Sequence, residues 1–385
     1  MDLSIVGSNP TQGLQLARTE ERSHYPLVAV HIDKGAVGPM KISAFATRSP
    51  RSPLAPFSVE RREPGPLDVL IENLFCGVCH SDIHQARDEW GGSIFPMVPG
   101  HEIVGKVIAV GNNVSKWKIG DVVGVGVIVD SCRVCPPCMS GEEVYCQKGP
   151  SYTYNSHEQD GKTPTFGGYS THVTVNQDYV LRIPQGMQAE RAAPLMCAGI
   201  TTYSPLSHWK VKEGQSVAIV GLGGLGHLGL KFAKAMGAEV TVLSHSPSKQ
   251  GDSERLGADD FVVTSSPDAF RANHERFDFI LDTVSAKHDY DSYLGLLKMD
   301  GTMALVGIPV PGSIRPQSLI DRRRSLVGSS AGGIRETQEM LDFSAKHGIG
   351  ADVEKIPIQK VNEAFERTLR SDVKYRFVID ISSLK

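Results

Sequence analysis

The hydrophobic pattern of this chain changes character near residue 197. Before that point the apolar residues form short runs of the kind that build strands, and glycines separate many of these runs. The runs cover residues 40–45, 58–61, 69–73, 103–110, 121–129 and 169–175. The first part of the chain is therefore predicted to be rich in β-structure.

Beyond residue 197, apolar runs alternate with helical stretches. We predict strands at residues 217–220, 240–243, 261–263, 279–281, 303–306 and 326–327. Strands that are apolar along most of their length and alternate with helices indicate a parallel sheet covered on both faces. Six such strands match a doubly wound dinucleotide-binding fold. The tail adds a helix at 336–346 and a strand at 375–381.

These patterns predict an α/β protein of two domains. The β-rich domain comprises residues 40–197 and 334–385, and the doubly wound domain comprises residues 198–333. Residues 1–39 lack a sustained periodicity and contain many turn formers. We interpret them as a loose extension, or as the product of a start codon assigned too far upstream.

Composition excludes several classes of function. The 385 residues include 40 basic and 43 acidic side chains, a net charge of −3 that does not suit a nucleic-acid binder. The basic run 322–324 is short and is expected to be solvated. No apolar stretch is long enough to span a membrane, and residues 1–39 contain no apolar h-region, which argues against a secretory or organelle signal. We therefore expect a cytoplasmic protein whose seven cysteines are reduced, which favours metal ligands over disulfides.

Four of the cysteines form a compact cluster. Cys132, Cys135, Cys138 and Cys146 follow the pattern C-x2-C-x2-C-x7-C. Four thiolates can close a tetrahedron around Zn²⁺ with no open position, which is typical of a structural site. Free or oxidised thiols would not explain the spacing, and a nucleic-acid zinc ribbon would need positive charge nearby.

A second metal site could be built from separated residues. Cys79, His101 and Cys197 would supply three ligands and leave a fourth position open, as in catalytic zinc sites. Spacing alone does not join them, and each could instead be a buried core residue.

A glycine-rich loop follows the predicted strand 217–220 and opens a helix. It contains Gly221, Gly223, Gly224, Leu225 and Gly226. In this context the glycines let the backbone approach a pyrophosphate at the helix N-terminus. The alternative is a glycine-rich turn that binds nothing.

The end of the next strand indicates which dinucleotide is bound. An enzyme that uses NAD carries an acidic residue there to hold the ribose 2′-hydroxyl. This chain has Ser244, His245 and Ser246 instead, followed by Lys249. Hydroxyls and a cation can hold a 2′-phosphate, so the sequence predicts NADP.

From about residue 40 to its end, the chain resembles the zinc-dependent alcohol dehydrogenases of the medium-chain dehydrogenase/reductase superfamily. It is most similar to their cinnamyl-alcohol-dehydrogenase-like, NADP-dependent branch. The matching motifs are G-H-E at 100–102, the four-cysteine cluster, F-G-G-Y at 166–169, C-A-G-I-T-T-Y at 197–203 and K-Y-R-F-V-I-D at 374–380. The resemblance implies a GroES-like catalytic domain joined to a Rossmann domain.

The resemblance also implies roles for the separated residues. Cys79, His101 and Cys197 would bind the catalytic zinc, and Glu102 would lie beside the metal and could replace its water ligand. Asp82 would orient His101 through the other ring nitrogen. Cys76, the remaining cysteine, is expected to be a core thiol.

By the same resemblance, Ser81 and His84 would form a proton relay that runs through the cofactor ribose. They could instead be a helix cap and a surface histidine. Thr201 would pack near the nicotinamide. Trp90 and Phe95 lie close to the zinc segments in sequence and could line an apolar substrate pocket, although they could equally be ordinary core aromatics.

We therefore expect reversible oxidation of an alcohol to an aldehyde, with NADP and two zinc ions per chain. The resemblance implies a homodimer joined at the sheet edge of the second domain. An NAD-dependent polyol or threonine dehydrogenase of the same superfamily is one alternative. The other is a non-catalytic zinc protein that binds NADPH as a sensor.

Overall fold

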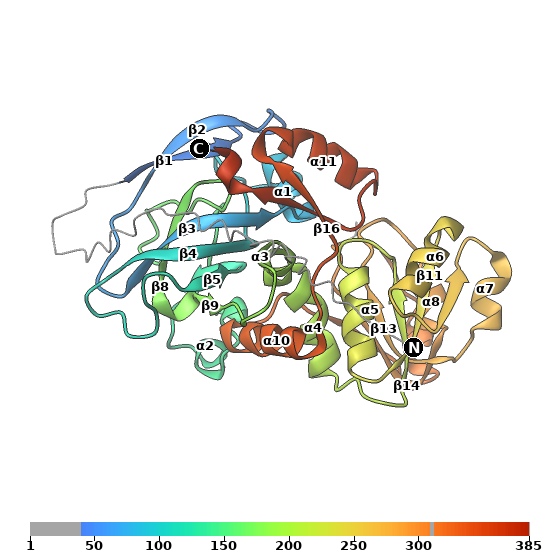
Figure 1. The fold of residues 1–385 in the computed structure, drawn as a ribbon. Coiled ribbons are helices and arrows are strands. Elements are labelled where there is room, and N and C mark those ends of the chain that lie inside the picture. The colour runs from blue at the N-terminus through green and yellow to red at the C-terminus, as the bar shows by residue number, and fades with distance from the viewer. Residues whose placement is uncertain (1–39, 309–311, 385) are drawn as a thin grey trace, which may run out of the picture.

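The computed structural model describes residues 40–308 and 312–384, so the prediction of a loose extension at 1–39 lies outside the described residues. Figure 1 shows two bodies side by side, one coloured blue to green and the other yellow to orange. The chain builds the strand-rich body first, crosses to the second body, and returns to the first with its red C-terminal segment.

The first body is built on a seven-stranded sheet in the order β16-β17-β3-β4-β5-β9, with β8 paired to β3. The strands are β3 (Asp68–Gly77), β4 (Ile103–Val110), β5 (Val122–Val125), β8 (His172–Asn176), β9 (Leu181–Arg182), β16 (Val353–Pro357) and β17 (Arg376–Asp380). Two small sheets pair β1 (Met40–Ala46) with β2 (Ala55–Arg61) and β6 (Ile128–Asp130) with β7 (Ser151–Tyr152). Because β17 pairs antiparallel with β3, the end of the chain completes a sheet begun some 300 residues earlier.

The second body is a six-stranded sheet in which every neighbouring pair is parallel. Its order is β12-β11-β10-β13-β14-β15. The strands are β10 (Ser216–Val220), β11 (Glu239–Ser244), β12 (Asp260–Val263), β13 (Phe277–Asp282), β14 (Leu297–Leu305) and β15 (Ser325–Gly328). This is the doubly wound strand order. The order in which the strands are added across the sheet reverses between β10 and β13, and proteins of this fold bind ligands beyond the carboxyl ends of these two strands. The predicted fold class is confirmed.

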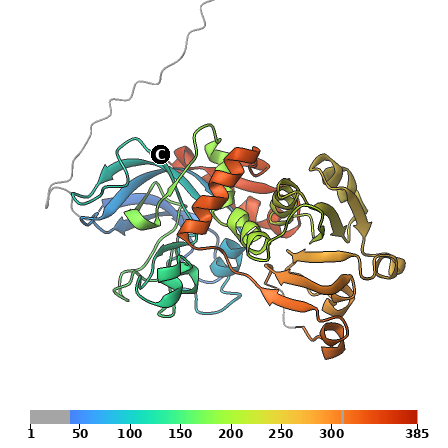
Figure 2. The ribbon, with the colours of Figure 1, turned by 90° about the horizontal axis from the view of Figure 1, so that it is seen from below.

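Helices cover the sheets and fill the junction between the two bodies. They are α1 (His80–Ala86), α2 (Pro136–Ser140), α3 (Ala189–Ala192), α4 (Ala198–His208), α5 (Gly226–Ala235), α6 (Gln250–Arg255), α7 (Pro267–Ala272), α8 (Tyr290–Leu294), α9 (Pro316–Ile320), α10 (Ile334–His347) and α11 (Val361–Leu369). Figures 1 and 2 both place α10 beside α4 at the junction, and α4 also packs against α5.

The junction is itself a hydrophobic core. One cluster of buried side chains includes Val104 of the first sheet, Ile200 of α4, Leu228 of α5 and Met340 of α10. Removing these side chains from water stabilises the contact by about 25 cal/mol per Å² of apolar surface. Helix α4 is therefore held firmly between the bodies, and this fixes the residue at its N-terminus.

Two local expectations were wrong. The run 121–129 is not one strand, because Thr153 bonds to the backbone of Gly126 and Val127, and the chain then turns away to pair β6 with β7. In the basic run 322–324, the third side chain is not solvated. Arg324 is almost buried and donates to the carbonyls of Leu297 and Ser318.

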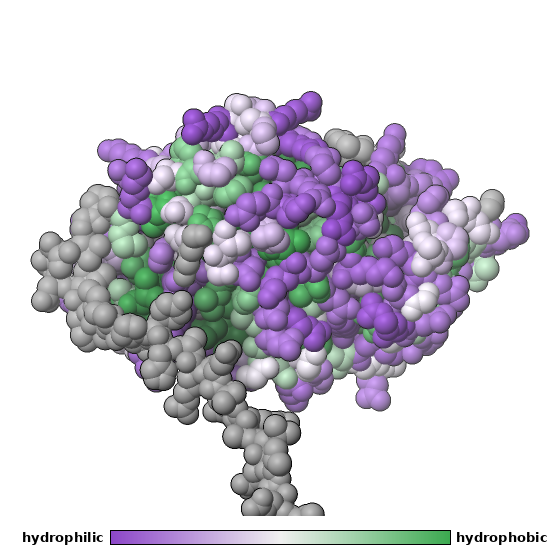
Figure 3. Space-filling model, turned by 45° about the horizontal axis from the view of Figure 1, so that its top comes forward, coloured by the Kyte–Doolittle hydropathy of each residue, from purple (hydrophilic) through white to green (hydrophobic). Residues whose placement is uncertain are grey.

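The predicted domain division at 197/198 and 333/334 stays a prediction, which the membership of the two sheets supports. A membrane span would need a longer apolar helix than any in the described part of the chain. On the face drawn in Figure 3, hydrophilic residues cover most of the half that lies away from the grey atoms.

Candidate active site

Four potential metal ligands from distant parts of the chain meet at the junction. Cys79 precedes α1, His101 and Glu102 lead into β4, and Cys197 precedes α4. One donor atom from each lies within 4.8 Å of all the others. The sequence predicted this group, and the structure brings all four together.

The sulfur spacing suits a metal. The Sγ atoms of Cys79 and Cys197 are 4.0 Å apart. A disulfide would need about 2.05 Å. Zn–S bonds of about 2.3 Å place two sulfur ligands of a tetrahedral site about 3.8 Å apart. The pair is therefore spaced as ligands of one ion are spaced.

A buried carboxylate organises the ligands. Asp82 accepts hydrogen bonds from the backbone N–H of Cys79 (2.9 Å) and Gly100 (3.1 Å) and from the hydroxyl of Tyr169 (3.1 Å). Its Oδ1 lies 3.3 Å from Nδ1 of His101. Because Nδ1 is engaged in this way, Nε2 of His101 is the nitrogen left for a metal. Asp82 thus lies where it can orient His101, which is the role expected for it.

The ligands influence one another's ionisation. The pKa of the Cys79 thiol lies well below its usual range, chiefly because of the hydrogen bond from Cys197. Burial opposes this effect, and His101 adds to it. The same hydrogen bond and burial raise the pKa of Cys197. Burial raises the pKa of Glu102 to about 8, although the guanidinium of Arg376 opposes this. The site thus gathers acidic groups that a divalent cation would hold in their charged form.

The donor set fits zinc on a further observation. Within the described residues, Oε2 of the fully buried Glu102 has no hydrogen-bond partner. A buried polar atom of this kind requires an explanation, and a cation beside the two sulfurs would provide one. Close packing confines the carboxylate, because a Cβ on Gly77 would lie 1.9 Å from Oε2.

The second cluster, Cys132, Cys135, Cys138 and Cys146, also converges to within 4.8 Å. Its sulfurs are 3.4 Å (Cys135 to Cys138) and 3.9 Å (Cys132 to Cys138) apart. Backbone N–H groups point at them, led by that of Val134, and lower the pKa of Cys132 to about 6. Four thiol groups held in this way fit a closed structural zinc site.

The predicted relay residues lie on α1, the helix that begins directly after Cys79. Ser81 Oγ is 3.6 Å from Cys79 Sγ. His84 directs Nδ1 to Glu89, 2.5 Å away, and its ring stacks on Trp90 with centroids 4.9 Å apart. Trp90 is 40% exposed and Phe95 is partly buried, so neither is an ordinary core aromatic.

The glycine loop lies at the carboxyl end of β10. Gly221 has a φ of +86°, and a Cβ on Gly226 would lie 1.9 Å from the carbonyl oxygen of Gly221. Around Gly223 there is open space, because nothing in the described structure lies within 4 Å of a Cβ placed there. Leu225 forms the N-cap of α5, and Thr201 lies on the first turn of α4. The loop therefore offers bare backbone to a phosphate group.

The end of β11 carries hydroxyls and a cation, although Ser244 itself is buried there. The hydroxyl of Ser244 accepts a hydrogen bond from the backbone N–H of Ser246, and both His245 and Ser246 are exposed. Lys249 Nζ lies 5.5 Å from the ring centre of Tyr375. This group suits a 2′-phosphate, as the sequence predicted.

Sequence reasoning missed three residues. Arg376 forms a buried ion pair with Glu102 and also abuts the glycine loop, because its Nη1 lies 3.0 Å from a Cβ built on Gly224. Glu89 holds His84, and Tyr154 stacks on His101. The matched motif K-Y-R-F at 374–377 contained Arg376, but the motif assigned it no partner.

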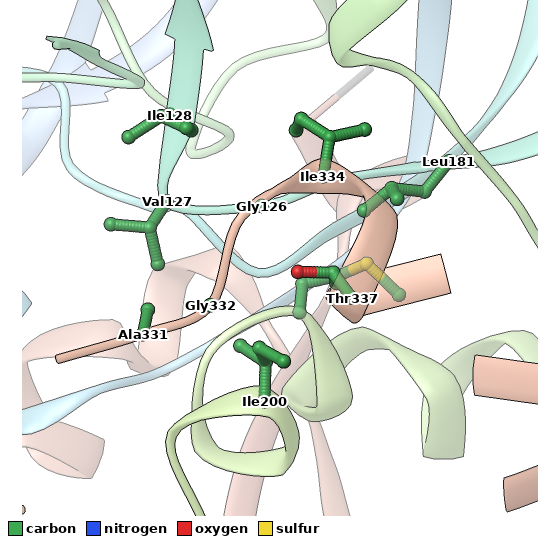
Figure 4. Close-up of a pocket in the computed structure, with 10 residues that line it drawn as sticks. Gly126, Val127, Ile128, Leu181, Ile200, Ala331, Gly332, Ile334 and Thr337 are labelled. Carbon is green, nitrogen blue, oxygen red and sulfur yellow. The ribbon is translucent and has the colours of Figure 1, made fainter. Parts of the chain in front are cut away.

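A small apolar cavity lies close to the N-terminus of α4, where Met196 and Ile200 belong to its lining. Figure 4 shows side chains from α4, α10 and the β5–β6 connection pointing into it, among them Ile200. The one hydroxyl in its lining belongs to Thr337, which donates to the Gly333 carbonyl at 2.7 Å. With its polar group satisfied, the cavity is a packing space rather than a ligand site.

Residues 65–185 match the family described as the alcohol dehydrogenase GroES-like domain, and residues 224–346 match the zinc-binding dehydrogenase family. The chain is 57% identical to "Probable formaldehyde dehydrogenase AdhA" of Bacillus subtilis, over 85% of this chain and 94% of that one. It is 54% identical to "Aldehyde reductase YahK" of Escherichia coli (90% and 99%) and 53% identical to "NADP-dependent alcohol dehydrogenase C" of Mycobacterium tuberculosis (89% and 99%).

Two solved structures are also similar. Cinnamyl alcohol dehydrogenase SbCAD4 of Sorghum bicolor aligns with a TM-score of 0.87 and 43% identity, over 89% of this chain and 98% of that one. The cinnamyl alcohol dehydrogenase of Helicobacter pylori, solved with NADP(H), aligns with a TM-score of 0.85 and 40% identity, over 89% and 99%.

Proposed function

The chain belongs to the zinc-binding alcohol dehydrogenase family of the medium-chain superfamily, and on this premise we propose that it interconverts aldehydes and alcohols with NADP(H). It is an oxidoreductase of the cinnamyl-alcohol-dehydrogenase-like type. The observation that carries the proposal is the convergence of Cys79, His101, Glu102 and Cys197 beside a glycine loop.

The chain has donor sets for two zinc ions. Cys79, His101 and Cys197 would hold the catalytic ion, Glu102 would lie beside it and could replace a water ligand, and the four-cysteine cluster would hold a structural ion. When bound, the catalytic zinc supplies a Lewis acid for the substrate oxygen, and the nicotinamide supplies or accepts the hydride.

The side chains of the site have separate tasks in orienting the metal ligands and in transferring the proton. Asp82 fixes the orientation of His101 through Nδ1. Ser81 lies close enough to the ligands to pass on the proton of the substrate hydroxyl. Since Glu89 engages Nδ1 of His84, Nε2 of that ring is free to take up the proton and release it to solvent.

The cofactor would bind along the ends of β10 and β11. Gly221, Gly223, Gly224, Leu225 and Gly226 would receive the pyrophosphate at the N-terminus of α5, with Thr201 beside the nicotinamide. The 2′-phosphate would be held by Ser244, His245, Ser246 and Lys249. The residues directly after β11 include no carboxylate, which would repel the phosphate.

The substrate would be an apolar aldehyde, aliphatic or aromatic and of the cinnamyl type, in contact with Trp90 and Phe95. We infer a cytoplasmic homodimer that joins through the exposed edge strand β15. Exposed apolar side chains lie near this edge, at Met299 and Ile320, and support such a contact.

One experiment tests the whole proposal: zinc is counted in the purified protein, and NADPH oxidation is followed with benzaldehyde and cinnamaldehyde. We expect two zinc ions per chain and turnover that is faster with NADPH than with NADH. A preference for NAD⁺ over NADP⁺ in the oxidation of polyols or threonine would support the superfamily alternative. Tight NADPH binding without turnover, in protein that retains both ions, would support a sensor.

A further inference from the structure

A tyrosine covers one face of the proposed metal-binding histidine. The rings of Tyr154 and His101 have centroids 5.6 Å apart and planes inclined by 23°. Both side chains are buried, with exposed fractions of 6% and 4%. This geometry is an offset stack, an arrangement that aromatic rings favour.

A buried carboxylate already holds the edge of the same histidine. It belongs to Asp82, whose Oδ1 faces Nδ1 of His101 at 3.3 Å. Asp82 thus restrains the edge of the imidazole, and Tyr154 restrains its face.

The backbone around Tyr154 is anchored independently of His101. The Thr153 backbone N–H donates to the Val127 carbonyl (3.0 Å), and Asn155 accepts from the Ile94 backbone N–H (2.7 Å). Asn155 adopts a φ of +53°, a conformation that asparagine tolerates better than most residues. Because neighbours on both sides fix this segment, the tyrosine ring can act as a rigid wall for the imidazole.

We propose that Tyr154 is a positioning residue of the catalytic metal centre, which keeps His101 Nε2 directed at the site of the two cysteine sulfurs. Rotation of a ligand ring about its Cβ–Cγ bond would displace Nε2 from the metal. The hydrogen bond at Nδ1 resists this rotation at one atom, and the stacked phenol resists it across the whole face. The inference rests on the proposed zinc-dependent function.

The chain offers a matched control in Tyr169. Its hydroxyl donates to the same carboxylate at 3.1 Å, but its ring lies near Phe365, with centroids 6.5 Å apart, and not on the ligand. The variant Tyr169→Phe removes one hydrogen bond to Asp82 and keeps its ring, and Tyr154→Phe removes a hydroxyl and keeps the stacked ring. Tyr154→Leu keeps apolar volume and removes the stack.

The test measures the rate at which a chelator removes the catalytic metal, the absorption spectrum of the Co²⁺-substituted enzyme, and kcat and KM for benzaldehyde. For Tyr154→Leu we expect metal release about 10-fold faster, a comparable loss of kcat and an altered Co²⁺ spectrum. For Tyr154→Phe and Tyr169→Phe we expect values within about threefold of wild type. KM for the aldehyde should change least, because Tyr154 is not proposed to touch the substrate.

Two results would overturn the inference. In the first, Tyr154→Leu releases its metal at the wild-type rate with an unchanged spectrum. In the second, it loses both zinc ions together with a lowered melting temperature, which identifies a general folding role. Absence of metal or turnover in the wild-type protein would instead defeat the proposed function, and this inference with it.

Discussion

The substitution Asp82→Asn probes the centre of the site with a change of one atom. The carboxylate accepts at Oδ2 from Cys79 N–H and the Tyr169 hydroxyl, and at Oδ1 from Gly100 N–H, with His101 Nδ1 close by. An asparagine has one oxygen, so its NH₂ group must face one of these pairs. In either orientation a fixed backbone N–H then meets another donor.

Two effects follow. Two hydrogen bonds to a charged acceptor, each worth about 1.5–3 kcal/mol, are lost, and relief from burying a charge offsets part of this. We therefore expect the free energy of unfolding to fall by about 3 kcal/mol. When NH₂ faces His101, the ring must accept at Nδ1 and carry its proton on Nε2, where it can no longer bind a metal. A 10- to 100-fold loss of catalytic zinc affinity is expected, or about 1.4–2.7 kcal/mol.

The assay is zinc competition with a chromophoric chelator, combined with kcat for benzaldehyde and thermal denaturation. Tyr169→Phe is the control, because it removes one hydrogen-bond donor to Asp82 and does not change which ring nitrogen of His101 carries the proton. If Asp82→Asn binds two zinc ions with wild-type affinity and turns over at the wild-type rate, the assignment of Nε2 as the ligand atom is wrong.

Three further changes test other parts of the molecule. Ser244→Asp places a carboxylate where the 2′-phosphate is proposed to bind, and the ratio of kcat/KM for NADPH to that for NADH should fall at least 10-fold; an unchanged ratio would contradict the cofactor assignment. Cys138→Ser should remove one zinc ion of two and lower the melting temperature, while the NADPH affinity of the protein that remains folded is kept, as fluorescence titration would check. The hydrogen bond with Asp282 raises the pKa of His288, so this pair stabilises the fold fully below pH 6.5 and loses its effect as pH rises through the raised pKa; His288→Gln should therefore lower the melting temperature more at pH 6 than at pH 9.

Much of the fold was predictable because its strands are short and apolar between clear breakers. All six strands of the parallel sheet were identified to within a few residues, except β14, which begins at Leu297 rather than at 303. The early start was hidden because Lys298 and Asp300 are polar and Met299, the apolar residue between them, is exposed, so the segment shows no apolar run. The break between β5 and β6 was not predictable either, because it depends on Thr153, a residue distant in sequence.

The candidate site was predictable only in part. The four-cysteine spacing is a local signal, and so is the glycine loop. No spacing rule joins Cys79, His101 and Cys197, and only the resemblance to a family brought them together. Tyr154 gave no signal at all, because a stack on a ligand ring depends on the return of the chain after β7, which the sequence pattern does not encode.

The late return of the chain to the first body explains how the two halves of the site are coupled. Tyr375 and Arg376 are consecutive residues; Tyr375 contacts the cofactor half of the site, and Arg376 contacts both halves. Tyr375 stacks on His227 of α5 and lies under Lys249 at the end of β11. Arg376 neutralises Glu102 beside the metal ligands and abuts the glycine loop.

The buried carboxylate of Glu102 would be strongly destabilising without the Arg376 guanidinium. The metal-side body therefore depends on a residue that follows the cofactor-side body in the sequence. The start of β17 is thus shared by both halves. Glu102, which can serve the metal, and the loop that can receive a pyrophosphate are held by one guanidinium. A movement of the two bodies against each other would therefore alter the contact of Arg376 with the glycine loop, while its ion pair with Glu102 lies within the first body.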